Sequence, residues 1–186
     1  MSQALPDGRG VVERLRNRGL PVRAMVHRED ERAATLRATG AEVVVGDLTV
    51  PTDVARAMEG CRRIYFGMSV SAPYLEATVI AAAVARERGD LEAFVNISQM
   101  TVSQMTLLNM TESPQQRQHL LAEQVLNWSG LPVVHVRPTV FLENFFFLAW
   151  AAESIARDGT IRLPFGTGRT SLPAPGARHV RCRARP

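Results

Sequence analysis

The sequence predicts an α/β fold built on a mainly parallel sheet. Short apolar runs of four to six residues alternate with longer stretches of helical periodicity along most of the chain. Strands that are separated by helices imply βαβ units, and the strands of such units lie parallel. The 186 residues suffice for one domain of this kind with a core of its own. No linker or low-complexity tract divides the chain before its last residues.

The first half of the chain predicts three helices and three strands. Val11, Val12 and Leu15 share one face of the first helix. Asp30 is a candidate N-cap of the second, because its side chain can accept from the backbone N–H groups of the first turn. Pro51 suits the first turn of the third helix. In chain order we expect a helix at 10–19, a strand at 21–26, a helix at 30–39, a strand at 42–45, a helix at 51–58 and a strand at 63–66.

The second half continues the alternation after one interruption. Residues 98–113 are polar, rich in Met and internally repetitive, and a loop of this length is usually functional or disordered. An aromatic cluster on a later helix has two interpretations, core packing or the lining of a flat apolar pocket. Its members are Phe141, Phe145, Phe146, Phe147 and Trp150. We expect a helix at 72–88, a strand at 93–97, a helix at 114–128, a strand at 133–136, a helix at 143–157 and a short strand at 161–164.

Composition excludes several classes of function. Hydrophobic residues make up 46% of the chain and charged residues 22%, as in ordinary globular proteins. No apolar run reaches the length of about 18 residues that a membrane helix needs, and no signal core follows Met1, so a cytoplasmic location is expected by default. Four arginines after residue 172 account for the net charge of +4, which leaves no basic surface for a nucleic acid. Cys61 and Cys182 form no disulfide or metal pattern, and the chain contains no Lys.

Two residues at the ends of neighbouring strands indicate a dinucleotide. In doubly wound sheets a dinucleotide lies across the carboxyl ends of the strands. Arg28 follows the strand at 21–26, and its guanidinium offers two donors to a phosphate on the adenosine ribose. Asp47 follows the strand at 42–45. This predicts NADP as cofactor rather than NAD, although NAD remains an option. Alternatively, Arg28 simply pairs with Glu29 or Asp30.

Several motifs in this order resemble the NmrA-like family, the atypical short-chain dehydrogenase/reductase branch that contains NAD(P)H-binding quinone reductases and redox-sensing regulators. The resemblance covers roughly residues 8–171 and implies a Rossmann-like three-layer sandwich. The motifs that carry it are Gly8-Arg9-Gly10-Val11-Val12, residues 22–28, Gly46-Asp47-Leu48, Asn96-Ile97-Ser98, residues 130–139 and Phe141-Leu142-Glu143-Asn144-Phe145.

The resemblance also implies roles for individual residues at the cofactor. Asp47 and Leu48 would lie beside the adenine, unless Asp47 only forms a turn after its strand. The segment Gly67-Met68-Ser69 would face the ribose and pyrophosphate, or again form only a turn. Asn96 and Ser98 would lie near the nicotinamide.

His119 is the candidate catalytic residue, because it falls where related atypical reductases carry a Lys. A His there could donate to a carbonyl oxygen or to the nicotinamide ribose, or it could only face solvent from its helix. Tyr65 and Tyr74 lie outside the positions at which classical members place a catalytic Tyr. Without an obvious acid, hydride transfer to a quinone is favoured over reduction of a simple carbonyl.

Both ends of the chain depart from the family pattern. Gly8 falls where the third glycine of a Gly-x-x-Gly-x-x-Gly loop belongs, while Leu5 and Ser2 occupy the other two positions, so the first strand and the glycine loop are expected to be largely missing. Residues 1–171 are predicted to form the dinucleotide-binding domain, incomplete at its N-terminus. Residues 172–186 are predicted to be an irregular Arg- and Pro-rich tail, of the kind that a frameshift would produce.

Three functions therefore remain open at the level of sequence. The first is an NADPH-dependent reductase of a small molecule such as a quinone, and the second is a dinucleotide-sensing regulator without turnover. The third is a degenerate fragment that binds no cofactor. The sequence names neither the substrate nor an oligomeric state.

Overall fold

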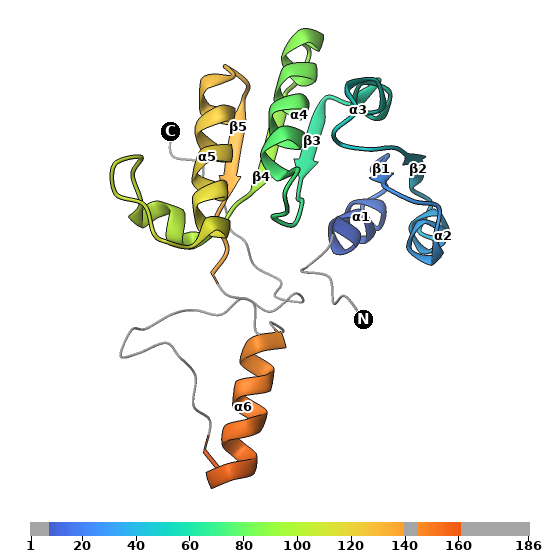
Figure 1. Ribbon diagram of the computed structural model, residues 1–186. Helices are drawn as coiled ribbons and strands as arrows, with labels where there is room; N and C mark the ends of the chain where they lie inside the picture. Colours follow the sequence, from blue (N-terminus) through green and yellow to red (C-terminus); the bar gives the residue numbers. More distant parts are fainter. Residues whose placement is uncertain (1–7, 140–144, 161–186) are drawn as a thin grey trace. The chain divides into compact units, whose positions relative to one another are not determined.

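The computed structural model describes residues 8–139 and 145–160, and it confirms the α/β class (Figure 1). The chain divides into two compact units, which are described separately. The larger, Pro6–Arg137, holds every described strand and all described helices but one. The second unit contains α6 (Phe145–Asp158).

Five parallel strands form two sheets among the described residues. One sheet pairs β1 (Arg23–Val26) with β2 (Glu42–Val45). The other has the order β3-β4-β5, made by β3 (Arg63–Phe66), β4 (Ala93–Ile97) and β5 (Val133–Val136). No described strand joins β1 to β3, and this is the place of the first strand, which is expected from the sequence to be largely missing.

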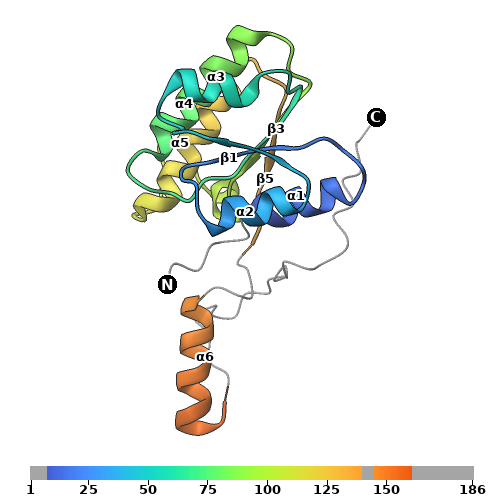
Figure 2. The same cartoon turned by 90° about the vertical axis from the view of Figure 1, so that its right-hand side faces the viewer.

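Helices lie on both faces of the strands, as expected of three layers (Figure 2). On one face, α1 (Gly8–Arg16) and α2 (Glu31–Ala38) cover a small core around Val12 and Leu36. On the other face, α3 (Pro51–Met58), α4 (Tyr74–Arg88) and α5 (Pro114–Trp128) cover the larger core. The side chains of Ala77, Ala81 and Ala85 on α4 are fully buried in this core. Their small size lets the helix backbone approach its neighbours closely.

Local signals in the sequence set most of these boundaries. Oδ1 of Asp30 accepts from the N–H groups of Arg32 and Ala33 at 2.9 and 3.1 Å, so the predicted N-cap is confirmed. Pro51 opens α3 as expected. Gly89 ends α4 in the left-handed region at φ 71°, which a residue without Cβ adopts at no steric cost. The first helix begins and ends earlier than predicted.

The predicted long loop at 98–113 is partly ordered. It contains a short 3₁₀ helix, η1 (Met100–Gln104), whose residue Val102 forms a small core with Met105 and Leu120 of α5. The predicted strand at 161–164, the tail at 172–186 and the segment before Gly8 lie outside the described residues, as do the side chains of the aromatic cluster. In the part that the structure describes, no helix has the length and hydropathy needed to cross a bilayer.

Candidate functional site

The predicted site residues follow the carboxyl ends of the strands. His27 and Arg28 come directly after β1, Asp47 after β2 and Gly67 after β3. Asn96 lies near the end of β4, one residue before its last. Because the strands within each sheet are parallel, these ends lie at one edge of that sheet, where dinucleotides bind in doubly wound folds.

Arg28 is exposed and free of side-chain partners within residues 8–139 and 145–160. The acids that could have paired with it are engaged elsewhere. Glu29 forms a two-pronged ion pair with Arg37, one contact of which is 2.8 Å between Oε2 and Nη2. Asp30 caps α2. The alternative interpretation of Arg28, pairing with its neighbours, is therefore not what the structure shows.

Asp47 forms the turn that the sequence left open as an alternative to adenine binding. Its Oδ1 accepts from the backbone N–H of Thr49 at 2.8 Å and from the Thr49 hydroxyl at 2.7 Å. These bonds hold the pKa of Asp47 below its ordinary value, because they favour the ionised carboxylate. Its other oxygen lies 3.7 Å from Nδ1 of His27, a residue that sequence reasoning did not single out. Leu48 packs against the larger core.

A Cβ atom added to Gly46 or Gly67 would meet close neighbours, whereas one added to Gly8 would make only an ordinary contact. A Cβ on Gly46 would lie 2.9 Å from both the Cβ of Asp53 and the Cε of Met25. A Cβ on Gly67 would lie 3.0 Å from Cε1 of Tyr65, and one on Gly8 would lie 4.0 Å from the same atom. The Tyr65 ring thus lies beside both the first residue of α1 and the end of β3. Sequence reasoning missed this position of Tyr65, since it depends on two segments far apart in the chain.

The rest of the segment after β3 has a mixed environment. Met68 is half-buried against the larger core, and Ser69 is exposed. Neither side chain forms a hydrogen bond inside the described ranges, so their predicted cofactor roles remain predictions.

Asn96 and Ser98 are buried at the end of β4. Asn96 is fully buried, and its amide nitrogen lies 3.1 Å from Nδ1 of His135 on β5. Nε2 of His135 in turn lies 3.0 Å from Oδ1 of Asn127 on α5. Burial lowers the pKa of His135, with an opposing contribution from the charge of Glu123. This chain of contacts holds the position of the Asn96 side chain.

His119 faces the protein interior rather than solvent. Only 9% of it is exposed, and its Nδ1 lies 3.1 Å from the hydroxyl oxygen of Tyr74. The two rings meet edge to face, with centroids 5.3 Å apart. Burial lowers the pKa of His119 below its ordinary value of 6.5, although the charge of Glu123 partly opposes this. Tyr74, which the sequence analysis set aside, is therefore the partner of the candidate catalytic residue.

The Tyr74 contact determines which nitrogen of His119 carries the proton. Tyr74 is fully buried, and burial raises the pKa of its hydroxyl to about 12. A buried O–H must donate to a partner, and Nδ1 of His119 is its only acceptor among the described residues. His119 is therefore neutral with its proton on Nε2, which makes no hydrogen bond within the described part of the chain. An Nε2–H group of this kind can donate to a ligand.

A buried ion pair lies one helical turn further along α5. Glu123 is 1% exposed and binds Arg137 in a two-pronged contact, with N–O distances of 2.9 and 2.5 Å. Burial opposes ionisation of Glu123, but Arg137 and the nearby Ser98 hydroxyl hold its pKa below the ordinary value. The Ser98 hydroxyl makes no hydrogen bond of normal geometry within the described ranges, whereas its backbone N–H donates to the carbonyl of Val136 at 2.8 Å.

Several buried polar atoms without a partner lie on or after β4 and on α5. They are Oδ1 of Asn96, Oγ of Ser98, Nε2 of Gln99, Oγ1 of Thr101 and Oε1 of Gln118. An unpartnered buried polar atom costs free energy, so such atoms are typical of places where water or a ligand binds. Of these five residues Asn96 and Ser98 were predicted, whereas the others come from a segment that the sequence predicts as a loop and from a helix position next to His119. No group of three metal-binding side chains occurs among the described residues.

The fold and the position of these residues define a class of protein, the nucleotide-binding α/β proteins with parallel strands and a site at their carboxyl ends. The chain belongs to the NAD(P)H-binding family, whose pattern matches residues 8–145. The match confirms the NAD(P)H-binding family that the resemblance implied. The fold of a doubly substituted mutant of NmrA agrees, with a TM-score of 0.65 and 19% identity over 75% of this chain and 43% of that one.

Two further relatives carry functional names. The (4-alkanoyl-5-oxo-2,5-dihydrofuran-3-yl)methyl phosphate reductase of Streptomyces griseus is 31% identical over 159 residues, which are 86% of this chain and 52% of that protein. The NADPH-dependent quinone oxidoreductase QOR2 of Escherichia coli, solved with NADPH, has a TM-score of 0.64 and 18% identity over 78% of this chain and 49% of that chain. The chain thus spans about half the length of both proteins.

Proposed function

We propose that this chain binds NADPH across the carboxyl ends of its strands and reduces a small conjugated molecule such as a quinone. The observation that carries the proposal is Arg28, which is exposed beside the end of β1 while Glu29 and Asp30 are bound elsewhere. A guanidinium at this position with no partner among the described residues suits a phosphate on the adenosine ribose.

The remaining residues fit the same cofactor. Gly8 begins α1, whose first turn contains no acidic residue, so the N–H groups there can face a pyrophosphate. Gly67 follows β3 at a place where a side chain would press on Tyr65. Asp47 and Leu48 would border the adenine, with Met68 and Ser69 along the ribose. The unpartnered oxygen of Asn96 and the hydroxyl of Ser98 would meet the nicotinamide end.

His119 supplies the group that such a reduction needs on the protein side. When bound, the cofactor supplies the hydride, and a quinone that accepts it takes up one proton to give the hydroquinone. The Nε2–H of neutral His119 would donate a hydrogen bond to the substrate oxygen on which negative charge grows. A neutral imidazole in this role depends on Tyr74, which keeps the proton on Nε2.

Cofactor preference tests the proposal directly. We expect NADPH to bind more tightly than NADH, as measured by titration of nucleotide fluorescence. Arg28→Ala should weaken NADPH binding by about tenfold to a hundredfold, the range for a lost hydrogen bond to a charged group, and change NADH binding by less than about twofold. Arg86→Ala is the matched control, since Arg86 is an exposed arginine in the last turn of α4. Equal losses for both nucleotides in the Arg28 variant would refute the phosphate contact.

Turnover tests the role of His119. His119→Ala should lower the rate of NADPH oxidation with a panel of quinones and leave the Kd of NADPH within about twofold. Tyr74→Phe should lower the same rate without abolishing activity. Without the Tyr74 hydroxyl, the proton of neutral His119 can lie on either ring nitrogen, so only a fraction of the molecules carries it on Nε2. A His119 variant with full activity would show that the side chain is structural.

A second function, dinucleotide sensing without turnover, is favoured by one observation. His119 is only 9% exposed, which restricts its access to a substrate. A sensor would bind NADPH in the titration and consume none of it with any quinone. A chain that binds neither nucleotide would instead be the degenerate fragment.

A further inference from the structure

A row of three polar side chains joins the surface of α5 to the interior beside β4. Nε2 of His135 lies 3.0 Å from Oδ1 of Asn127, which is exposed on α5, and Nδ1 of His135 lies 3.1 Å from the amide nitrogen of Asn96. Asn96 and His135 are register partners on β4 and β5, so their side chains leave the sheet on the same face. The fully buried Asn96 is thereby linked to solvent through one histidine ring.

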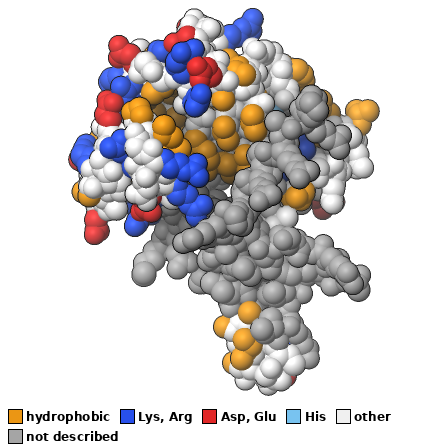
Figure 3. All heavy atoms as spheres, turned by 180° about the vertical axis from the view of Figure 1, so that it is seen from behind, with side chains coloured by type: hydrophobic (Ala, Val, Ile, Leu, Met, Phe, Trp, Pro, Cys, Tyr) orange, Lys and Arg blue, Asp and Glu red, His pale blue; other side chains and the backbone are white. Residues whose placement is uncertain are grey.

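This polar row stands where apolar side chains usually cover parallel strands. Hydrophobic side chains gather in the middle of the described part on the face drawn in Figure 3, and Phe94, two residues before Asn96, is fully buried in the larger core. A buried amide in such surroundings costs free energy for each polar atom that lacks a partner. The nitrogen of Asn96 has a partner in His135, whereas its Oδ1 has none within the described ranges.

Amide chemistry sets the direction of each hydrogen bond in the row. The amide nitrogen of Asn96 can only donate, so Nδ1 of His135 accepts and carries no proton. The side-chain oxygen of Asn127 can only accept, so Nε2 of His135 carries the proton. His135 is therefore a neutral ring in this arrangement, and Asn96 keeps its oxygen, an acceptor, for another partner.

A proton added to Nδ1 of His135 reverses the amide of Asn96. Both ring nitrogens of a charged histidine are donors, so two donors would face each other at the contact with Asn96. The amide relieves this conflict when it turns over about its last side-chain bond and places Oδ1 on the new N–H group. Its NH2 group then takes the place of the oxygen, and the side chain offers a donor instead of an acceptor.

We propose that His135 is a positioning residue whose charge decides whether Asn96 offers an acceptor or a donor to a ligand at the carboxyl ends of the strands. Asn96 is the last residue but one of β4. The neutral ring suits a ligand that presents an amide N–H donor, such as the carboxamide of a nicotinamide, and the charged ring disfavours it. The part that concerns the ligand rests on the proposed function, whereas the reversal of the amide does not.

The surroundings of His135 set the pH range of this reversal. Burial is the largest influence and lowers the pKa of His135 below its ordinary value of 6.5. Glu123 on α5 favours the charged ring and Arg137 on β5 opposes it, and these two side chains are paired with each other. The contacting side chains from β4 and from the end of α5, Asn96 and Asn127, carry no charge. The reversal is therefore expected on the acid side of neutrality.

NMR of the full chain tests the reversal without a nucleotide. At about pH 8 the ring nitrogens of His135 should show a proton on Nε2 and none on Nδ1, and the side-chain amide signals of Asn96 should shift together with His135 as the pH falls to about 5. His135→Asn is the matched control, because its Oδ1 can accept in the place of Nδ1 and does not titrate. The Asn96 signals of this variant should stay constant. A proton on Nδ1 at the higher pH, or Asn96 signals that ignore the titration of His135, would overturn the proposal.

Nucleotide affinity tests the consequence for binding. Between about pH 8 and pH 5, the Kd of NADPH should rise about threefold to tenfold more for the parent chain than for His135→Asn, the range for one neutral hydrogen bond. Protonation of His119 and of the cofactor's phosphate is common to both proteins and cancels in this comparison. Equal pH dependence would overturn the proposed effect on the ligand. A chain that binds no NADPH at any pH would refute the proposed function and with it the ligand part of the inference, while the NMR result decides the reversal separately.

Discussion

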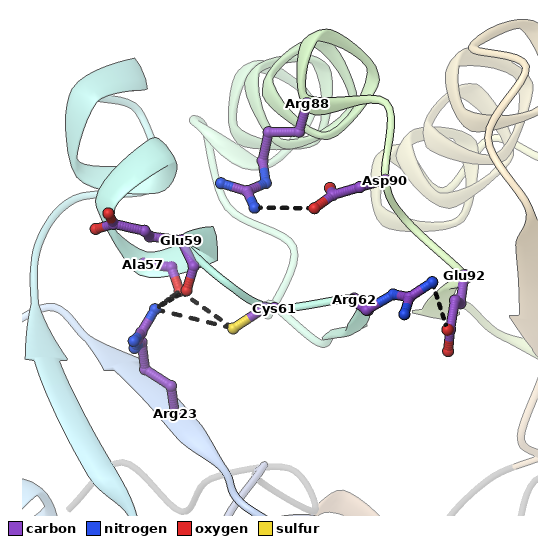
Figure 4. Close-up of polar contacts among 8 residues, drawn as sticks. All are labelled: Arg23, Ala57, Glu59, Cys61, Arg62, Arg88, Asp90 and Glu92. Atoms are coloured by element: carbon purple, nitrogen blue, oxygen red, sulfur yellow. Dashed lines mark hydrogen bonds and ion pairs between the residues drawn. The ribbon is translucent and has the colours of Figure 1, made fainter.

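Arginine side chains at the amino ends of the strands have partners within the fold (Figure 4), whereas Arg28 at the carboxyl end of β1 has none among the described residues. At the amino ends, each guanidinium is held by at least one carboxylate or carbonyl: Arg62 and Arg63 bind Glu92, Arg88 binds Asp90, and Arg23 binds Glu42 and two carbonyls. At the carboxyl ends, Arg28 has no partner among the described residues, and five buried polar atoms there lack one. Arg137 is the exception, because it neutralises the buried Glu123.

The contrast separates stability from function. The guanidinium groups at the amino ends have carboxylate or carbonyl partners within the fold, although Nε of Arg23 and Nε of Arg88 are buried without a hydrogen bond of normal geometry. The buried polar atoms without a partner at the carboxyl ends cost free energy in the isolated protein, and a ligand that supplies partners recovers that cost on binding. The predictions below test this difference, beginning with the largest effect.

Removal of the one paired arginine at the carboxyl end should be the most damaging change. Arg137→Ala leaves the Glu123 carboxylate 1% exposed and unpaired, and we expect a loss of roughly 2 kcal/mol in the free energy of unfolding. The loss is below that of a fully buried pair because the Arg137 side chain is 38% exposed. Urea denaturation measures it, and Glu123→Gln in the same background should restore part of the stability. A loss below about 0.5 kcal/mol, the size of an exposed pair, would show that the pair is not structural.

Close packing at the end of β2 predicts the next largest effect. Gly46→Ala places a Cβ 2.9 Å from atoms of Asp53 and Met25, and we expect a loss of about 1 to 3 kcal/mol from overpacking. Gly10→Ala is the matched control, because nothing lies within 4 Å of its added Cβ inside α1. That variant should gain about 0.5 to 1 kcal/mol from helix propensity. A Gly46 variant as stable as the parent in thermal unfolding would contradict the packing argument.

Protonation of His119 should contribute to the loss of stability at low pH. Its pKa is lower in the folded than in the unfolded state, so the unfolded chain takes up a proton first. The free energy of unfolding is then highest above the ordinary value of 6.5 and falls as the pH drops below it. His119→Gln removes this titration and should make the curve less steep between about pH 7 and 5, where His135 still contributes. An unchanged slope would place the titrating group elsewhere.

The smallest effect is expected at the amino ends. Arg62→Ala removes an ion pair of 2.9 Å in which the arginine side chain is 67% exposed, and the loss should stay within about 0.5 kcal/mol. The loss in free energy of unfolding is therefore expected to be severalfold larger for Arg137→Ala than for Arg62→Ala. A loss at Arg62 as large as that at Arg137 would remove the distinction between the two ends.

The sequence determined the elements of this fold with good accuracy. The bounds of β2, α3, β3, β4, α5 and β5 coincide with the predicted ranges, because periodicity, Pro51 and similar signals act within a few residues. The position of Arg28 just after β1 could be predicted too, because the strand itself is recognisable from its local apolar pattern. The loop at 98–113 was harder, since η1 is held by contacts with α5 that no local pattern records.

The sequence by itself also determined the family, through motifs in order along the chain. Only the tertiary structure decided which residues meet: Tyr74 with His119, Asp30 with α2 rather than Arg28, and β1 with no described strand on its far side. Hydrogen bonds and strand pairing join positions tens of residues apart, and their formation depends on the packing of whole elements. The protonation of His119 follows from one such contact, and so does its proposed role.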